Sequence, residues 1–86
     1  MTIHIPDALR SYTGRKSAVE AEGRTLAEVL AELERRHPGL RFRIVTEQDT
    51  IRPHIRIFVN EEQARDLSAV LRPDDQIHIV LALSGG

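Results

Sequence analysis

The sequence predicts an α+β domain in which one main helix covers one face of a mixed sheet of four to five strands. A single amphipathic helix, between Thr25 and Pro38, needs a sheet to cover its apolar side. The first and last strands, residues 2–5 and 76–82, lie too far apart to form a hairpin, and the strands share a polar face. The 86 residues, 41% of them hydrophobic, suit one domain with a modest core.

The first two elements are predicted to be strands. Residues 2–5 alternate apolar and polar side chains and stop at Pro6, as expected where a strand meets a turn. Residues 6–14 contain Pro, Asp, Ser and Gly, which favour a long hairpin connection. Residues 16–21 are then expected to return as a second, antiparallel strand.

The main helix follows these strands. Thr25 and Glu28 have the spacing of a capping box, in which the Thr25 hydroxyl accepts the Glu28 N–H and the Glu28 carboxylate reaches back. Pro38 ends the helix because it disfavours helical geometry at the preceding residue, and Gly39 can adopt a positive φ. One apolar stripe at helical spacing is predicted, and it consists of Leu26, Val29, Leu30 and Leu33.

The second half of the chain contains two more strands. Residues 54–60 and 76–82 each alternate with period two, and residues 72–75 form a tight turn before the last strand. Residues 40–46 give no firm assignment, although an edge strand after the helix would bring the sheet to five strands. The apolar anchors expected in this half are Leu40, Phe42, Ile44 or Val45, then Ile55, Ile57 and Val59, and then Leu67, Val70 and Leu71.

This order of strands and helix is the β-grasp arrangement of ubiquitin. In that fold the last strand is central and parallel to the first, so the chain leaves the sheet from its middle. We therefore expect a β-grasp domain, residues 1–82, and a flexible C-terminal tail, residues 83–86. The sheet face turned away from the helix is expected to carry His4, His54, Arg56, Phe58, His78, Val80 and Ala82.

The tail is the candidate site. Leu83 and Ser84 lead to Gly85 and Gly86, which have no Cβ atoms and can lie extended in a slot too narrow for other residues. A terminal carboxylate has a pKa of roughly 3.5, so it is ionised at neutral pH and is a poor electrophile. Such a group needs activation, and the usual solution is transfer of an adenylyl group from ATP by a partner enzyme.

The last strand with Gly85-Gly86, the Thr25–Glu28 helix start and the strand Ile57-Phe58-Val59-Asn60 resemble the ubiquitin-like sulfur-carrier family over nearly the whole chain. That family includes the small subunit of molybdopterin synthase, the thiamin-biosynthesis sulfur carrier and a carrier used in cysteine biosynthesis. The resemblance implies a carrier and not an enzyme. A ubiquitin-activating-type enzyme would use ATP to adenylate Gly86. A persulfide or sulfide donor would then form a thiocarboxylate, and a second enzyme would accept the sulfur. Leu83, Ser84 and Gly85 would serve in recognition of the tail.

The outer sheet face is the candidate docking surface. Phe58 beside Val80 and Ala82 makes a small apolar patch with polar neighbours, a pattern typical of partner sites. The strand and tail are also similar to those of ubiquitin, whose corresponding His and Val belong to its recognition patch. The alternative is that Phe58 only caps the sheet edge. The expected partner-binding residues are Arg56, Phe58, His78, Val80 and Ala82.

Composition argues against several other classes of function. The net charge of -1, with one tyrosine and two phenylalanines, gives little basis for nucleic-acid binding. No apolar run could span a bilayer and no signal peptide is evident, so we expect a cytoplasmic protein, monomeric when free. The chain has no cysteine. His4, His54 and His78 lie on neighbouring strands, but without Cys or carboxylates at a motif spacing they predict no metal site.

Two other functions stay open. One is a ubiquitin-like modifier whose activated Gly86 is attacked by a lysine amine, and the other is a non-covalent β-grasp binding module. The receiving pathway is also open among cysteine, thiamin, molybdopterin and siderophore thioacid biosynthesis. The loop at residues 14–17 and the segment 57–62 are more similar to the cysteine-biosynthesis and siderophore thioacid carriers. That similarity would imply a deubiquitinase-type metalloprotease, which trims an adduct from Gly86, as a further partner.

Overall fold

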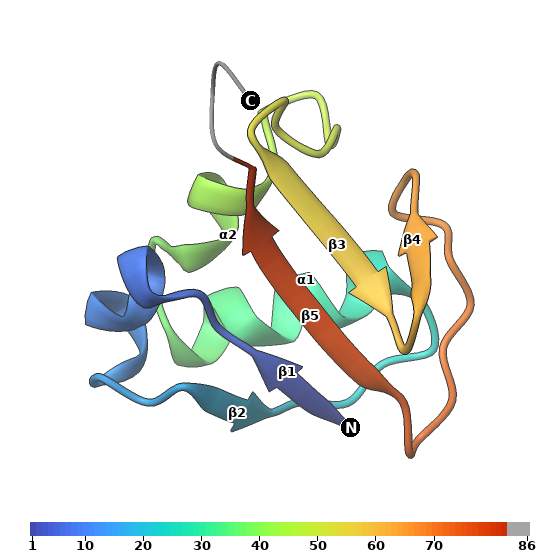
Figure 1. Cartoon of the computed structure of the whole chain (residues 1–86), viewed down its shortest axis with the longest axis horizontal. Coiled ribbons are helices and arrows are strands. Elements are labelled where there is room, and N and C mark those ends of the chain that lie inside the picture. Colours follow the sequence, from blue (N-terminus) through green and yellow to red (C-terminus); the bar gives the residue numbers. More distant parts are fainter. Residues whose placement is uncertain (83–86) are drawn as a thin grey trace.

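The computed structural model describes residues 1–82 and confirms the predicted β-grasp arrangement. Five strands form one mixed sheet in the order β2-β1-β5-β3-β4. The central strand is β5 (Gln76–Leu81), which is parallel to β1 (Thr2–His4) and antiparallel to β3 (Ile55–Val59) (Figure 1). The last strand therefore lies in the middle of the sheet, as the sequence predicted.

Two short strands form the edges of the sheet. β2 (Ala18–Glu20) is the predicted second strand and pairs antiparallel with β1. β4 (Glu62–Ala64) is the fifth strand, and it begins where the sequence predicted only a turn. Asn60 has a φ of 57°, a left-handed conformation that asparagine tolerates, so the chain reverses at once and Glu62 pairs with Val59.

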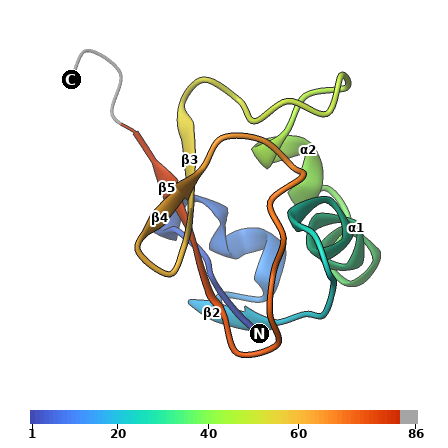
Figure 2. The same cartoon turned by 90° about the vertical axis from the view of Figure 1, so that its right-hand side faces the viewer.

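The helices lie on one side of the sheet and leave the other side open (Figure 2). α1 (Leu26–Arg36) presents the predicted apolar stripe to the sheet, and each of its four side chains is at most 1% exposed. Ile3, Ile57 and Ile77 meet this stripe from the sheet and are equally buried. No helix within residues 1–82 combines the length and hydrophobicity needed to cross a bilayer.

The start of α1 is capped by Thr25 and Glu28 as predicted, except that Glu28 reaches the residue before the cap and not Thr25 itself. The N–H of Glu28 donates to the Thr25 hydroxyl at 3.3 Å, and the Glu28 carboxylate accepts the N–H of Arg24 at 2.8 Å. The loop at residues 65–75 adds a feature that the sequence did not reveal. Its backbone carbonyls accept the first two N–H groups of the helix, each at 3.0 Å, so the helix start is satisfied by backbone as well as by side chains.

Two connections are helical where no helix was predicted from the sequence. Residues within the predicted hairpin connection form a 3₁₀ helix, η1 (Asp7–Thr13), between β1 and β2. The unassigned stretch forms α2 (Leu40–Ile44). Gly39 precedes it with a φ of 95°, and the carboxylate of Glu34 accepts the N–H groups of Gly39 and Arg41 at 2.9 and 3.0 Å. A side chain of α1 therefore fixes the start of α2.

Two of the predicted core anchors are wrong. Phe42 is 54% exposed because α2 turns its Leu40 and Ile44 side chains inward instead. Val70 is 80% exposed, since its backbone forms a bridge to Thr25 while Leu67 and Leu71 supply the buried contacts. The remaining anchors are buried or packed against the core, and they are Leu40, Ile44, Val45, Ile55, Ile57, Val59, Leu67 and Leu71.

The turn before β5 is held by one buried carboxylate. Asp75 is 8% exposed, and it accepts the backbone N–H of Arg72 at 2.8 Å and the side-chain amide of Asn60 at 3.0 Å. The hydrogen bond from Arg72, followed by that from Asn60, lowers the pKa of Asp75 below its ordinary value. The carboxylate thus links the β3–β4 turn to the start of β5.

The substitution Asp75→Asn should destabilise the domain by about 1–2 kcal/mol at pH 7, because an amide nitrogen would face a hydrogen-bond donor. Since its folded pKa is lowered, Asp75 contributes stability above about pH 4 that is lost as the pH falls through that pKa. The variant should therefore lose less stability than the parent between pH 5 and 3. Urea unfolding followed by circular dichroism checks this. Asp74→Asn, at an exposed neighbouring carboxylate, is the matched control.

Candidate functional site

The end of β5 fixes the point from which the tail starts. Ile77 and Ile79 anchor the strand in the core, at 1% and 3% exposed. The N–H of Ala82 donates to the carbonyl of His54 at 2.8 Å, so pairing with the β3 side continues to the last described residue. The predicted site residues beyond it lie outside the described part of the chain, and they are Leu83, Ser84, Gly85 and Gly86.

The register of β3 and β5 brings together the predicted docking residues. Arg56 lies opposite Val80, and Phe58 lies opposite His78. Val80 is 42% exposed, Phe58 and His78 are half-buried, and Ala82 follows on the same side of the chain. This is the side that the helices leave open in Figure 2. We call Arg56, Phe58, His78, Val80 and Ala82 the outer-face patch.

A second histidine orients His78 within this patch. The imidazole rings of His4 and His78 stack, with centroids 4.3 Å apart and planes 6° apart. The Nε2 atom of His4 lies 2.7 Å from Oε1 of Gln76, which holds the outer ring of the stack. His54 lies at the other end of β5, beside Ala82. Within residues 1–82, no three His, Asp or Glu side chains are placed to hold a metal ion.

A hollow of about 380 Å³ opens on the other side of the β5 end. Leu81 and His54 line it together with Tyr12 of η1 and Arg43 of α2. The Nε atom of Arg43 donates to the Tyr12 hydroxyl at 2.6 Å, which ties α2 to η1 at this point. The last described residues therefore lie between the outer-face patch and this hollow.

The structure adds neighbours to the patch that sequence reasoning missed. β4 places Gln63 opposite Phe58, and Arg65 follows immediately after the strand. β4 has too few residues to show a period-two pattern, and its pairing depends on the reversal at Asn60. No signal in the sequence alone therefore placed Arg65 near the candidate docking surface.

Comparison with known proteins finds similar proteins that cover nearly the whole of this chain. The sequence matches the model of the ThiS family over residues 3–86. Sulfur carrier protein CysO of Mycobacterium tuberculosis is 32% identical over 91 residues, covering 100% of this chain and 98% of that protein. A chain of the crystal structure of the Amycolatopsis orientalis BexX/CysO complex is 36% identical with a TM-score of 0.92, covering 99% of this chain and 98% of that one. Small archaeal modifier protein 1 of Haloferax volcanii is 25% identical with a TM-score of 0.75, covering 99% and 97%.

Proposed function

The chain belongs to the ThiS family of small sulfur carrier proteins, which are not enzymes, and from this premise we propose that it carries sulfur as a thiocarboxylate on Gly86. The observation that carries the proposal is the match of the family over residues 3–86, which includes the Gly85-Gly86 ending. The central position of β5 supports it, because a strand held on both sides presents the following residues from a fixed point.

The chemistry needs three steps. A partner enzyme transfers the adenylyl group of ATP to a carboxylate oxygen of Gly86 and releases pyrophosphate. A sulfide or persulfide donor then attacks the carbonyl carbon, AMP leaves with the bridging oxygen, and a thiocarboxylate forms. With a persulfide donor, a thiol must also cleave the S–S bond. The thiocarboxylate sulfur then attacks an acceptor bound by a second enzyme and displaces its leaving group. Water cleaves the resulting acyl–sulfur bond, which leaves the sulfur on the acceptor and regenerates the carboxylate. ATP is thus a substrate of the partner, and this chain needs no cofactor of its own.

The tail supplies access to the partner's active site. Gly85 and Gly86 have no side chains, so an extended backbone can enter a narrow channel and approach ATP closely. Leu83 and Ser84 are the side chains nearest to the glycines, and we assign them to recognition of the tail. The group that reacts with ATP in this proposal is therefore the carboxylate at the end of the tail.

The outer-face patch is the proposed docking surface for the adenylating enzyme. Its exposed Val80 and half-buried Phe58 give it an apolar centre, while Arg56 and His78 provide polar neighbours. The similarity to a chain of the BexX/CysO complex supports a function exercised together with a partner protein. A cytoplasmic location and a monomeric free state stay predictions.

The test is the intact mass of the protein. The purified chain is incubated with ATP, sulfide and its cognate adenylating enzyme, and its mass should rise by about 16 Da, the difference between sulfur and oxygen. Omission of ATP is the control. Fragmentation should place the added mass on Gly86. An unchanged mass in the complete reaction would reject the proposal.

A modifier function is the second candidate, supported by the likeness to small archaeal modifier protein 1 of Haloferax volcanii. In that case a lysine amine of another protein attacks the activated Gly86 and forms an isopeptide bond. Affinity purification of the tagged chain under denaturing conditions distinguishes the two. Conjugates of higher mass indicate a modifier, whereas a thiocarboxylate on the unconjugated chain indicates a carrier.

A further inference from the structure

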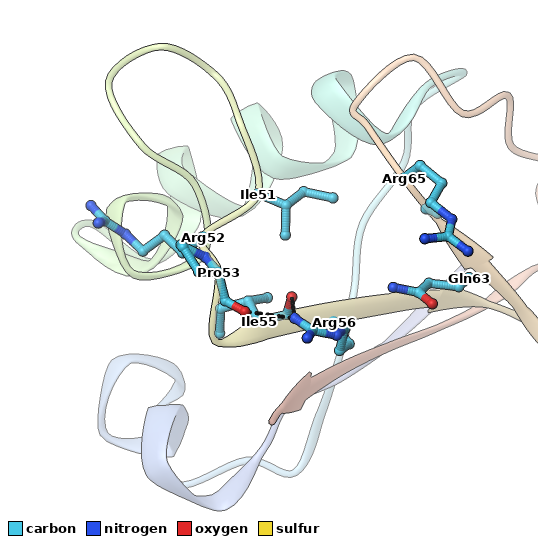
Figure 3. Close-up of a pocket in the computed structure, with 8 residues that line it drawn as sticks. Ile51, Arg52, Pro53, Ile55, Arg56, Gln63 and Arg65 are labelled. Carbon is cyan, nitrogen blue, oxygen red and sulfur yellow. Dashed lines mark hydrogen bonds between the residues drawn. The ribbon is translucent and has the colours of Figure 1, made fainter. Parts of the chain in front are cut away.

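The sheet has a gap beside the outer-face patch. β4 ends at Ala64, opposite Ile57, whereas β3 begins two residues earlier at Ile55. A cavity of about 340 Å³ occupies the space beyond the end of β4 (Figure 3). Its apolar wall includes Ile51 and Pro53, from the loop that precedes β3.

Arg56 is held at the floor of this cavity by backbone carbonyl groups. Its Nη1 atom donates to the carbonyl of Pro53 at 2.6 Å and to that of Ile55 at 3.1 Å. Within residues 1–82, its Nε and Nη2 atoms have no hydrogen-bond partner. A guanidinium fixed in this way loses little further conformational freedom when a ligand binds its remaining edge.

Arg65 places a second positive charge at the same cavity. If the β3–β4 register is continued past Ile57 and Ala64, Arg65 lies opposite Arg56. Figure 3 shows Arg65 and Gln63 on the side of the cavity across from the Ile51–Pro53 loop. Like charges placed opposite each other on neighbouring strands are unfavourable unless an anion lies between them.

No acidic residue lines the cavity in the described part of the chain. Among residues 1–82, Arg56 and Arg65 form no ion pair, whereas Arg35 and Arg36 share Glu32 on α1. Arg52, a third arginine at the cavity rim, is engaged elsewhere, because its guanidinium lies 4.6 Å from the centre of the Phe42 ring. The two arginines therefore form a positively charged site that lacks a counter-charge within the domain.

Building on the proposed function, we propose that Arg56 and Arg65 bind a carboxylate side chain of the adenylating enzyme when that enzyme docks on the outer-face patch. Arg56 belongs to both the patch and the cavity, so a partner that covers the patch reaches the cavity as well. The free Nε and Nη2 edge of Arg56 matches the two oxygens of a carboxylate. Arg65 adds the second charge, and the apolar wall accommodates the methylene groups of a glutamate.

The test measures the dissociation constant of the adenylating enzyme by calorimetry, without ATP, for matched charge reversals. Arg65→Glu should weaken binding about 10-fold, and the double variant with Arg56→Glu about 100-fold. Arg24→Glu, on the loop before α1, makes the same charge change away from the cavity and should alter binding less than about 2-fold. Arg56→Lys keeps the charge but loses the planar fork, so its loss should exceed that of Arg24→Glu.

Two further readouts complete the experiment. Raising the salt concentration should weaken binding of the parent more than that of the double variant, because the removed contacts are ionic. Reversing one acidic residue of the enzyme to arginine should restore binding of Arg65→Glu. Equal affinities for the double variant and Arg24→Glu, or no binding of the parent at all, would overturn the carboxylate site. The mass gain of about 16 Da is measured in a separate reaction with ATP. A failure of thiocarboxylate formation is therefore distinguished from a failure of the carboxylate site, which the dissociation constants test.

Discussion

Deletion of Gly86 is expected to reduce the rate of thiocarboxylate formation at least about 100-fold, because it withdraws the reacting carboxyl group by the length of one residue. An extended residue spans about 3.3–3.6 Å. Displacements of about 1 Å already cost enzymes about 100-fold in rate, since reacting groups must be aligned. The measurement is the time course of the mass gain with ATP, sulfide and the adenylating enzyme.

The same deletion should leave the folded domain unchanged. The five strands and both α-helices that the structure describes lie within residues 1–82, which the deletion leaves unchanged. The thermal unfolding midpoint and the enzyme's affinity for the outer-face patch should therefore match those of the parent. If the shortened chain is loaded on Gly85 at the parental rate, Gly86 is not the specific attachment residue.

Phe58→Ala is expected to weaken binding of the adenylating enzyme about 30-fold, because large aromatic side chains contribute most to affinity at a docking surface. Phe58 is the aromatic side chain of the patch, and it lies opposite His78 on one side and Gln63 on the other, so it has a neighbour on each adjacent strand. Titration of the enzyme by calorimetry gives the dissociation constant, and circular dichroism verifies that the variant is folded.

Val70→Ala is the matched control for Phe58→Ala. Val70 is also a large apolar side chain at the surface, 80% exposed, but it lies on the loop along α1 and not on the open sheet face. Its truncation should change the affinity by less than about 2-fold. Similar losses in both variants would show that exposed apolar area in general, and not the outer-face patch, governs binding.

The sequence predicted the elements whose signals are local. The stripe on α1, the cap at Thr25 and the alternation in β3 and β5 each arise from neighbouring residues, and each is present in the structure. α2 could not be predicted in this way, since its start depends on Glu34 of the preceding helix. The exposure of Phe42 and Val70 likewise depends on contacts made by distant segments.

The features of the candidate site also fall into those that local sequence predicts and those that depend on distant segments. Strand parity was enough to place Arg56, Phe58, His78 and Val80 on one face, because side chains alternate along a strand. The stacking of His4 on His78 could not be predicted from strand parity, because it depends on the parallel register of β1 and β5. Arg65 required the position of β4, since the sequence predicted a fifth edge strand after the helix without placing it at residues 62–64. The attachment of sulfur to Gly86 stays a prediction.

The central position of β5 also bears on when the protein becomes usable during its synthesis. Apart from β5, the strands of the folded sheet pair only as β1–β2 and β3–β4, and these two pairs share no strand contact. Only β5 joins them, and it contributes His78 and Val80 to the face that a partner would grip. A nascent chain that still lacks β5 has neither the completed sheet nor His78 and Val80, so we expect the outer-face patch to form only once synthesis has passed this last strand.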